Sequence, residues 1–221
     1  MAVSGKLVVE VWSDVICPFC YIGKRHLELA IASLPQPELV DVRWRSFQLD
    51  EQAPVDFNMG LVELLARKYG TSVKTAEERS QGIAARAAEV GLTFNYRNAV
   101  PTNTYNAHRM LHLAAVHGIQ DKAKERLLLA YFTEGQHIGR LDTLLQLGKE
   151  IGLPEPELET LLEGDDFKDA VKSDMAEARR MGVSGVPFFL IDGKHTISGA
   201  QPVEVFRSTL TKAWGSRIQG R

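Results

Sequence analysis

Cysteine is scarce in this sequence: two residues in 221 are too few for the disulfide framework of a small secreted domain. No apolar run reaches the roughly 20 residues that a transmembrane helix needs, so no membrane partner is expected. Basic residues number 26 and acidic residues 28, and this net charge of −2 gives no footprint for nucleic acid. Residues 1–6 lack the basic and apolar regions of a signal peptide, so we expect a cytoplasmic protein.

The two cysteines lie at a predicted junction between a strand and a helix. Residues 7–12 are β-branched and aromatic enough to predict a short buried strand, and a helical pattern of apolar residues begins after Cys20. Pro18 suits the first position of that helix, where its missing N–H is not needed. Cys17 is therefore the predicted N-cap residue.

This placement has chemical consequences. The free N–H groups and the positive dipole end of a helix start favour a thiolate, so the pKa of Cys17 should be lowered. Cys20 lies three positions further on, within disulfide reach. The pattern predicts a redox pair in which Cys17 is the nucleophile and Cys20 the resolving thiol, with Pro18 and Phe19 helping to set the reduction potential.

A structural zinc site and a pair of inert buried thiols are the alternatives. Zinc takes four ligands, and the sequence has no second cysteine pair. His108 and His112 are four residues apart on one predicted helix face, but no third ligand follows at a suitable spacing. No metal is therefore expected. In a reducing compartment, a close cysteine pair at a helix start favours redox chemistry over a structural role.

Strand patterns occur only near the two ends of the chain. A helix predicted over 18–34 is followed by an alternating strand over 40–47. An apolar strand over 186–191 precedes the Asp192-Gly193 turn signal and a return strand over 194–198. The two ends should share one sheet, because neither buries its strands alone.

Helices fill the rest of the chain. After a loop from Gln48, the expected helices cover residues 59–69, 75–90, 105–117, 121–134, 141–151, 154–162 and 165–181, with a last one over 203–214. The fold class is therefore α/β with a large all-helical insertion. We expect residues 1–50 and 183–221 to form the α/β domain and residues 51–182 the insertion domain.

These pieces together resemble a known family. A strand, a Cys-Pro-Phe-Cys helix start, a helical insertion and a Val-Pro hairpin entry are similar to the DsbA-type thioredoxin-fold oxidoreductases, and most to their FrnE-like branch. The segments that carry the resemblance are Asp14–Cys20 with Tyr21–Lys24, Asn103–Thr104 with Ala107–Arg109, Gly182–Phe189, and Ser198–Pro202. They span nearly the whole chain.

The resemblance implies a thioredoxin-like fold and thiol–disulfide oxidoreductase activity. It implies that the Val186–Pro187 peptide bond is cis and lies beside Cys17. A substrate peptide would then pair with the Val186 backbone while its sulfur meets Cys17, so Pro18, Phe19, Val186 and Pro187 are the expected substrate-binding residues. The expected partner is a protein or small molecule that carries a disulfide or a dithiol.

Other functions stay open at this point. Kappa-class glutathione transferases and chromene-carboxylate isomerases resemble the same fold, but they have serine at the first motif position, where this chain has Cys17. A glutathione-dependent isomerase or transferase is the alternative activity, and a redox-sensing binding module is a non-enzymatic one. The presence of both Cys17 and Cys20 favours dithiol chemistry.

Three further residues are candidates for the site. Asp14 could act in proton transfer near the sulfurs, or serve only as a turn or cap residue. His108 and Arg109 could contact an anionic group such as a glutathione carboxylate, or be structural. No bound cofactor is expected, although glutathione is a candidate redox partner. An apolar surface on the insertion would support a homodimer.

Overall fold

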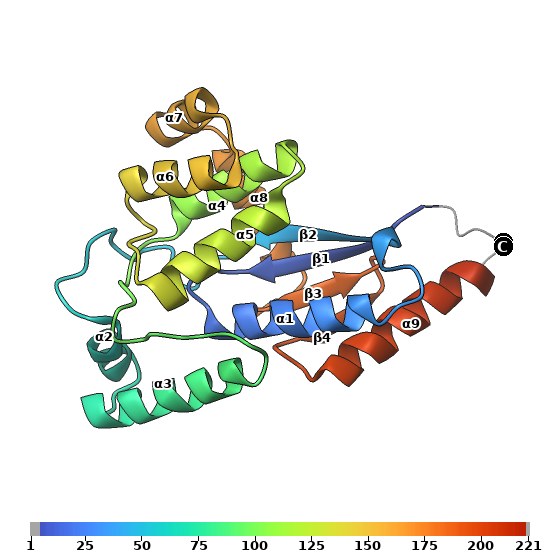
Figure 1. The fold of residues 1–221 in the computed structure, drawn as a ribbon, viewed down its shortest axis with the longest axis horizontal. Helices are drawn as coiled ribbons and strands as arrows, with labels where there is room; N and C mark the ends of the chain where they lie inside the picture. The colour runs from blue at the N-terminus through green and yellow to red at the C-terminus, as the bar shows by residue number, and fades with distance from the viewer. Residues whose placement is uncertain (1–4, 220–221) are drawn as a thin grey trace.

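Four strands form one mixed sheet in the order β2–β1–β3–β4 in the computed structural model, which describes residues 5–219 (Figure 1). The strands are β1 (Leu7–Ser13), β2 (Val40–Ser46), β3 (Phe188–Ile191) and β4 (His195–Ser198). β1 pairs parallel with β2 and antiparallel with β3. The two ends of the chain share one sheet, which confirms the thioredoxin-like fold.

Helices supply most of the remaining structure. In chain order they are α1 (Pro18–Ala32), the 3₁₀ turn η1 (Pro37–Leu39), α2 (Leu61–Lys68), α3 (Val73–Ala88), α4 (Tyr105–Val116), α5 (Gln120–Leu129), the π-helical turn η2 (Ala130–Glu134), α6 (Leu141–Ile151), α7 (Glu155–Glu163), α8 (Lys168–Arg180) and α9 (Val203–Gln219). All of α2 to α8 lie between β2 and β3, as the helical-insertion prediction requires. Within residues 5–219, no helix has the length and apolar character of a membrane span.

Some helix ends differ from the predictions. The helix expected from residue 165 begins at Lys168, because Phe167 adopts a left-handed conformation with φ 61°. The helix expected to end at Glu134 leaves the α conformation after Leu129 and finishes as η2. The last helix continues beyond Trp214 to Gln219.

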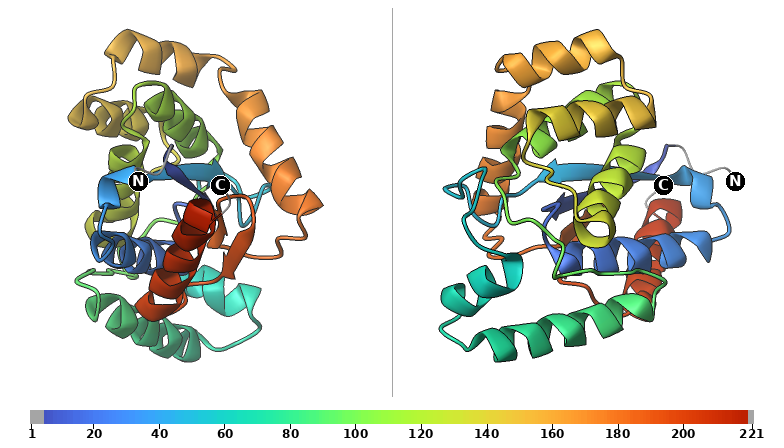
Figure 2. Two further views of the ribbon diagram at one scale, coloured as in Figure 1. Left: turned by 90° about the vertical axis from the view of Figure 1, so that its right-hand side faces the viewer. Right: turned by 60° about the vertical axis from the view of Figure 1, so that its left-hand side comes forward.

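The two faces of the sheet pack against different helices. Leu7, Val9 and Val11 alternate along β1 and point into an apolar cluster with α1 and α9. Figures 1 and 2 show α9 alongside α1 on this face. Trp12 points to the opposite face, where its indole N–H donates to the Asp174 carbonyl of α8 at 2.9 Å. The sheet is therefore covered on one side by its own helices and on the other by the insertion.

A second apolar cluster joins α1 to the insertion. Val15, Tyr21 and Ile22 belong to it together with residues of the inserted helices, and the rings of Phe94 and Phe132 stack in it at 4.4 Å. This cluster therefore contains residues from both sides of the boundary expected at residue 50. The division into residues 1–50, 51–182 and 183–221 stays a prediction, and its terminal residues 1–4 and 220–221 lie outside the described part.

The insertion also covers the open edge of β2. The Gln120 amide of α5 accepts from the Trp44 backbone N–H and donates to the Trp44 carbonyl, both at 2.9 Å. Two residues further along β2, the Ser46 N–H donates to the Asp174 carboxylate at 2.8 Å. Side chains of the insertion therefore replace a neighbouring strand, which protects the edge from pairing with another chain.

Candidate active site

The two cysteines lie at the start of α1, as predicted. Cys17 is the N-cap residue, with extended φ and ψ of −89° and 115°, and Pro18 follows at the first helical position. The Cys20 N–H donates to the Cys17 carbonyl at 3.1 Å. Cys17 is 4% exposed and Cys20 is 0% exposed, and the two are not bonded to each other. Cys17 is thus the thiol nearer to solvent.

The loop before β3 faces this helix start. The Val186–Pro187 peptide bond is cis, as the family resemblance implied. The Cys17 Sγ lies 3.5 Å from the Val186 carbonyl oxygen, within reach of a weak S–H hydrogen bond. The Pro187 carbonyl accepts from the Gly199 N–H at 2.8 Å, which fixes this loop to the end of β4.

The two thiols ionise as a coupled pair. Within the pair, the pKa of Cys20 is lowered, because the hydrogen bond from the Cys17 thiol and the nearby Lys124 ammonium outweigh the effect of burial. The pKa of Cys17 is raised well above its usual value, because the hydrogen bond to Cys20 and burial both favour the neutral Cys17 thiol. The lowering expected for Cys17 from its place at the helix start therefore falls on its partner in the pair. The site therefore stabilises a single thiolate.

Lys124 on α5 is the cation that lowers the pKa of Cys20 in this pair. Its side chain is fully buried, and its Nζ donates to the Ser13 carbonyl at 3.4 Å and lies 5.5 Å from the centre of the Trp44 ring. Burial lowers the pKa of Lys124 to about 8, although Cys20 and Asp14 pull it upward. A buried ammonium whose pKa is close to neutral pH can stabilise a neighbouring thiolate or exchange a proton with it.

Asp14 holds the loops behind the cysteines. Its Oδ1 accepts from the Val15 N–H at 2.7 Å, and its Oδ2 accepts from the Leu49 N–H at 2.8 Å. Burial would raise the pKa of Asp14, but hydrogen bonds from His108 and Leu49 keep it lowered. An ionised carboxylate with these partners positions the site, and the proton-transfer role suggested for Asp14 gains no support from this geometry.

His108 belongs to the same buried group. Its Nε2 lies 3.2 Å from the Asp14 Oδ1, while its Nδ1 has no hydrogen-bond partner within the described residues. Burial lowers the pKa of His108 more than Asp14 raises it, so the ring is neutral and Nε2–H donates. With no exposed surface, His108 orients Asp14 and has no access to a substrate anion.

Arg109 does not join the cysteines, and the suggested contact with a substrate anion does not fit its placement. The guanidinium donates to the carbonyls of Leu161, Gly164 and Asp166, and to the Asn106 side chain. These bonds tie α4 to the connection between α7 and α8. Because each of its three nitrogens donates within the protein, Arg109 has the structural role that was its alternative.

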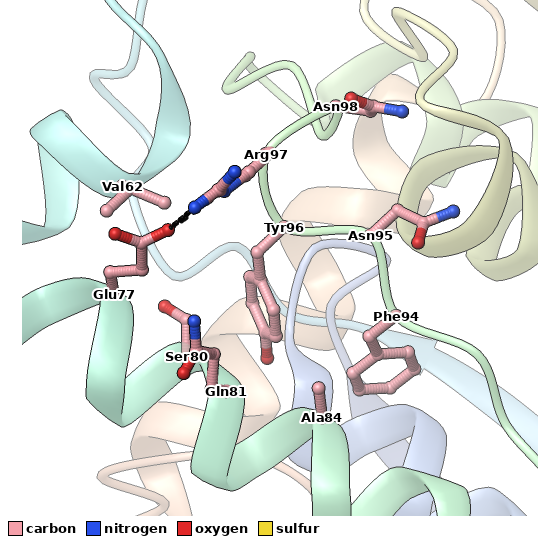
Figure 3. A pocket seen from close by; sticks show the side chains of 10 residues that line it. All are labelled: Val62, Glu77, Ser80, Gln81, Ala84, Phe94, Asn95, Tyr96, Arg97 and Asn98. Atoms are coloured by element: carbon pink, nitrogen blue, oxygen red, sulfur yellow. Dashed lines mark hydrogen bonds and ion pairs between the residues drawn. The ribbon is translucent and has the colours of Figure 1, made fainter.

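A cavity of about 480 Å³ opens beside Cys17. Cys17, Pro18, Phe19 and Val186 all line it, whereas Pro187 and Cys20 do not. Three of the four expected substrate-binding residues therefore share one cavity with the more exposed thiol. A smaller cavity of about 320 Å³ lies next to it around the Glu77–Arg97 ion pair, and Tyr96 lines both (Figure 3).

Two positions that shape the site were not predicted. Lys124 lies in a charged stretch of the sequence that gives no sign of burial. Gly23 lies inside α1, and a Cβ there would be 3.0 Å from the Pro187 ring and 3.2 Å from Phe189. A glycine inside a helical pattern is a signal of close packing that the sequence did offer.

We expect Gly23→Ala to destabilise the protein by about 1–2 kcal/mol, because the added methyl meets the Pro187 ring at the packed α1–β3 contact. Gly82→Ala is the matched control: Gly82 lies inside α3 with open space around it, so the same change should stabilise by about 0.5–1 kcal/mol. Urea unfolding measures both. Equal effects of the two substitutions would contradict the close-packing role of Gly23.

The geometry defines a class of protein: a dithiol at the first helix of a thioredoxin-like sheet, opposite the carbonyl before a cis-proline, is the arrangement of a thiol–disulfide oxidoreductase. The chain belongs to the DSBA-like thioredoxin domain family, whose model matches residues 8–211. It is a thiol–disulfide oxidoreductase of that family. The narrower FrnE-like placement stays a prediction.

Individual relatives agree with this assignment. The probable DsbA oxidoreductase SCO1869 of Streptomyces coelicolor has 36% identity and a TM-score of 0.90, over 95% of this chain and 90% of that one. The uncharacterized protein YwbO of Bacillus subtilis (strain 168) is 27% identical over 92% of this chain and 95% of its own. The fold is also that of the cytosolic disulfide reductase DsbM from Pseudomonas aeruginosa, solved with GSH, at 20% identity, a TM-score of 0.65, and 95% and 100% coverage.

Proposed function

We propose that this protein reduces disulfides, with Cys17 as nucleophile and Cys20 as resolving thiol. The observation that carries the proposal is the pairing of Cys17 and Cys20 at the α1 start, with the Cys17 Sγ 3.5 Å from the Val186 carbonyl. The difference in burial supports these two roles, because of the two cysteines only Cys17 lines the cavity from which a substrate would approach.

The chemistry proceeds in two exchanges. The Cys17 thiolate attacks one sulfur of a substrate R–S–S–R′, forming the Cys17–S–S–R bond, and R′–S⁻ leaves with the electron pair and takes up a proton. The Cys20 thiolate then attacks the Cys17 sulfur, forming the Cys17–Cys20 disulfide, and R–S⁻ leaves. The substrate has gained two electrons and the protein has lost two.

A thiol reductant must then restore the dithiol. Two molecules of a monothiol such as glutathione supply the two electrons and become its disulfide. The solved structure of DsbM, described as a cytosolic disulfide reductase with GSH, supports this choice of reductant and a reducing compartment such as the cytoplasm. A protein substrate would pair with the Val186 backbone beside Cys17.

The reduction potential of the Cys17–Cys20 pair tests the direction of the reaction. We expect a value of about −220 to −260 mV, close to the poise of a cytosolic glutathione pool, because glutathione could not reduce a pair that lies well below about −300 mV. Equilibration in glutathione buffers, followed by mass spectrometry of the two cysteines, measures it. A value near about −120 mV, in the range of strong oxidants, would contradict the reductase function and indicate an oxidase.

A further inference from the structure

The cavity beside Cys17 has an apolar wall built from several segments. Its side chains come from the cysteine segment, the loop after β2, and helices α2 and α3: Ile16, Phe19, Phe57, Leu61, Leu65 and Ile83. All six are partly exposed, so they retain apolar surface that a ligand would bury. At about 480 Å³ the space matches sites for small organic molecules.

The loop that forms part of this wall is fixed in place. The Thr102 hydroxyl donates to the Val55 carbonyl at 2.7 Å, and the Asn103 amide donates to the Ala53 carbonyl at 2.8 Å. At its start, the Leu49 N–H is held by Asp14. The wall is therefore tied to the same buried carboxylate that organises the cysteine segment.

Charge is sparse in the lining. Asp50, Lys68 and Arg79 are its charged side chains, and all three are exposed. Glutathione disulfide carries four carboxylates and two ammonium groups at neutral pH, and burying these against an apolar wall without partners is costly. The inner cavity therefore selects against a highly charged tripeptide and in favour of a neutral, apolar group.

Tyr96 gives a second, independent indication of a ligand. The residue is 8% exposed and lines the cavity, yet its hydroxyl has no hydrogen-bond partner among residues 5–219. Figure 3 shows its ring extending from the 94–98 segment between α3 and Phe94. Burial, together with the Cys17 thiolate, raises the pKa of Tyr96, which keeps it a hydroxyl donor in the cavity that it shares with Cys17. An unpaired buried hydroxyl is costly unless a ligand supplies the acceptor.

We propose that this cavity is the subsite for a small disulfide substrate whose non-reacting group is neutral and aromatic or branched aliphatic, with the Tyr96 hydroxyl donating to an acceptor next to the reacting sulfur. The proposal rests on the disulfide reduction proposed above and names its substrate class. A single amino-acid side chain would leave much of the space unfilled, which favours a small molecule over a protein substrate.

The test compares three disulfides with the reduced full-length protein. They are 2,2′-dithiodipyridine, which is neutral, aromatic and has a ring nitrogen beside each sulfur; bis(2-hydroxyethyl) disulfide, which is neutral but small; and glutathione disulfide. The rate constant for Cys17 with each is divided by that of N-acetylcysteine, so that intrinsic reactivity cancels. We expect the normalised rate to be highest for 2,2′-dithiodipyridine.

Two variants locate the effect. Leu65→Arg places a charge in the cavity wall and leaves the apolar core intact. It should lower the rate constant for 2,2′-dithiodipyridine about tenfold, or about 1.4 kcal/mol. The rate constants for the other two disulfides should stay within twofold of the wild-type values. The matched control is Leu29→Arg on the exposed face of α1, where Leu29 is 50% exposed, and it should change none of the rates.

Tyr96→Phe should slow 2,2′-dithiodipyridine about fivefold and leave the melting temperature unchanged or higher, because it removes an unpaired buried hydroxyl. Rates that do not depend on Leu65 and Tyr96, or an equal loss with glutathione disulfide, would each overturn the cavity proposal alone. A reduced wild-type protein that exchanges with none of the disulfides would instead overturn the proposed function.

Discussion

Replacing Cys20 by serine is expected to stop turnover and leave Cys17 joined to the substrate as a mixed disulfide. Cys20 is buried directly behind Cys17, so its attack is intramolecular, and well-oriented intramolecular reactions reach effective molarities of about 10⁵ M. An external thiol at millimolar concentration cannot replace it, so we expect a loss of at least about 10³-fold. Mass spectrometry of the protein after exposure to a disulfide detects the trapped adduct.

Cys17→Ser is the control for this experiment. It removes the thiol that lines the cavity, so it should abolish adduct formation altogether, whereas Cys20→Ser should form the adduct and fail to release it. In a glutathione-dependent isomerase or transferase, Cys17 would only position the sulfur of glutathione, and Cys20 would not be needed. Survival of such an activity in Cys20→Ser, with no loss of overall rate, would favour that alternative over dithiol chemistry.

Much of the fold could be predicted from periodicity alone. The alternation of Leu7, Val9 and Val11 marks one buried face of β1, and the Asp192-Gly193 signal does form a turn, with φ of 54° and 65°. Left-handed Phe167 could not be anticipated, because a bulky residue at positive φ depends on tertiary packing. The same holds for the π-helical turn that follows Leu129.

The site divides in a similar way. Cys17 and Cys20 follow from the local chemistry of a helix start, whereas Pro187 follows only from the family resemblance. Lys124 could not be found this way: it is 104 positions after Cys20 (124 − 20 = 104), and only the fold buries it beside the thiols. Arg109 differs again: the sequence left open a substrate contact or a structural role, and only the fold shows that all three guanidinium nitrogens donate within the protein.

Lys124→Met is expected to slow thiolate-dependent exchange about tenfold at pH 7 and to move its pH profile upward. The ammonium lowers the pKa of the first thiol to ionise, so its removal raises that pKa. Each unit by which the pKa then exceeds the working pH reduces the thiolate fraction tenfold. In the wild type the ammonium itself deprotonates near pH 8, so the difference between the two proteins should shrink above that pH.

A structural effect of Lys124 can be separated from this electrostatic one. Methionine matches the length of the lysine stem and carries no charge, so a fully buried position should keep or gain stability in urea unfolding. Lys212→Met, at an exposed position on α9, is the matched control and should change neither rate nor profile. A Lys124→Met protein that is equally slow at every pH and less stable would show that the ammonium only holds the Ser13 carbonyl. An upward shift of the profile with stability retained requires the charge to act on the dithiol.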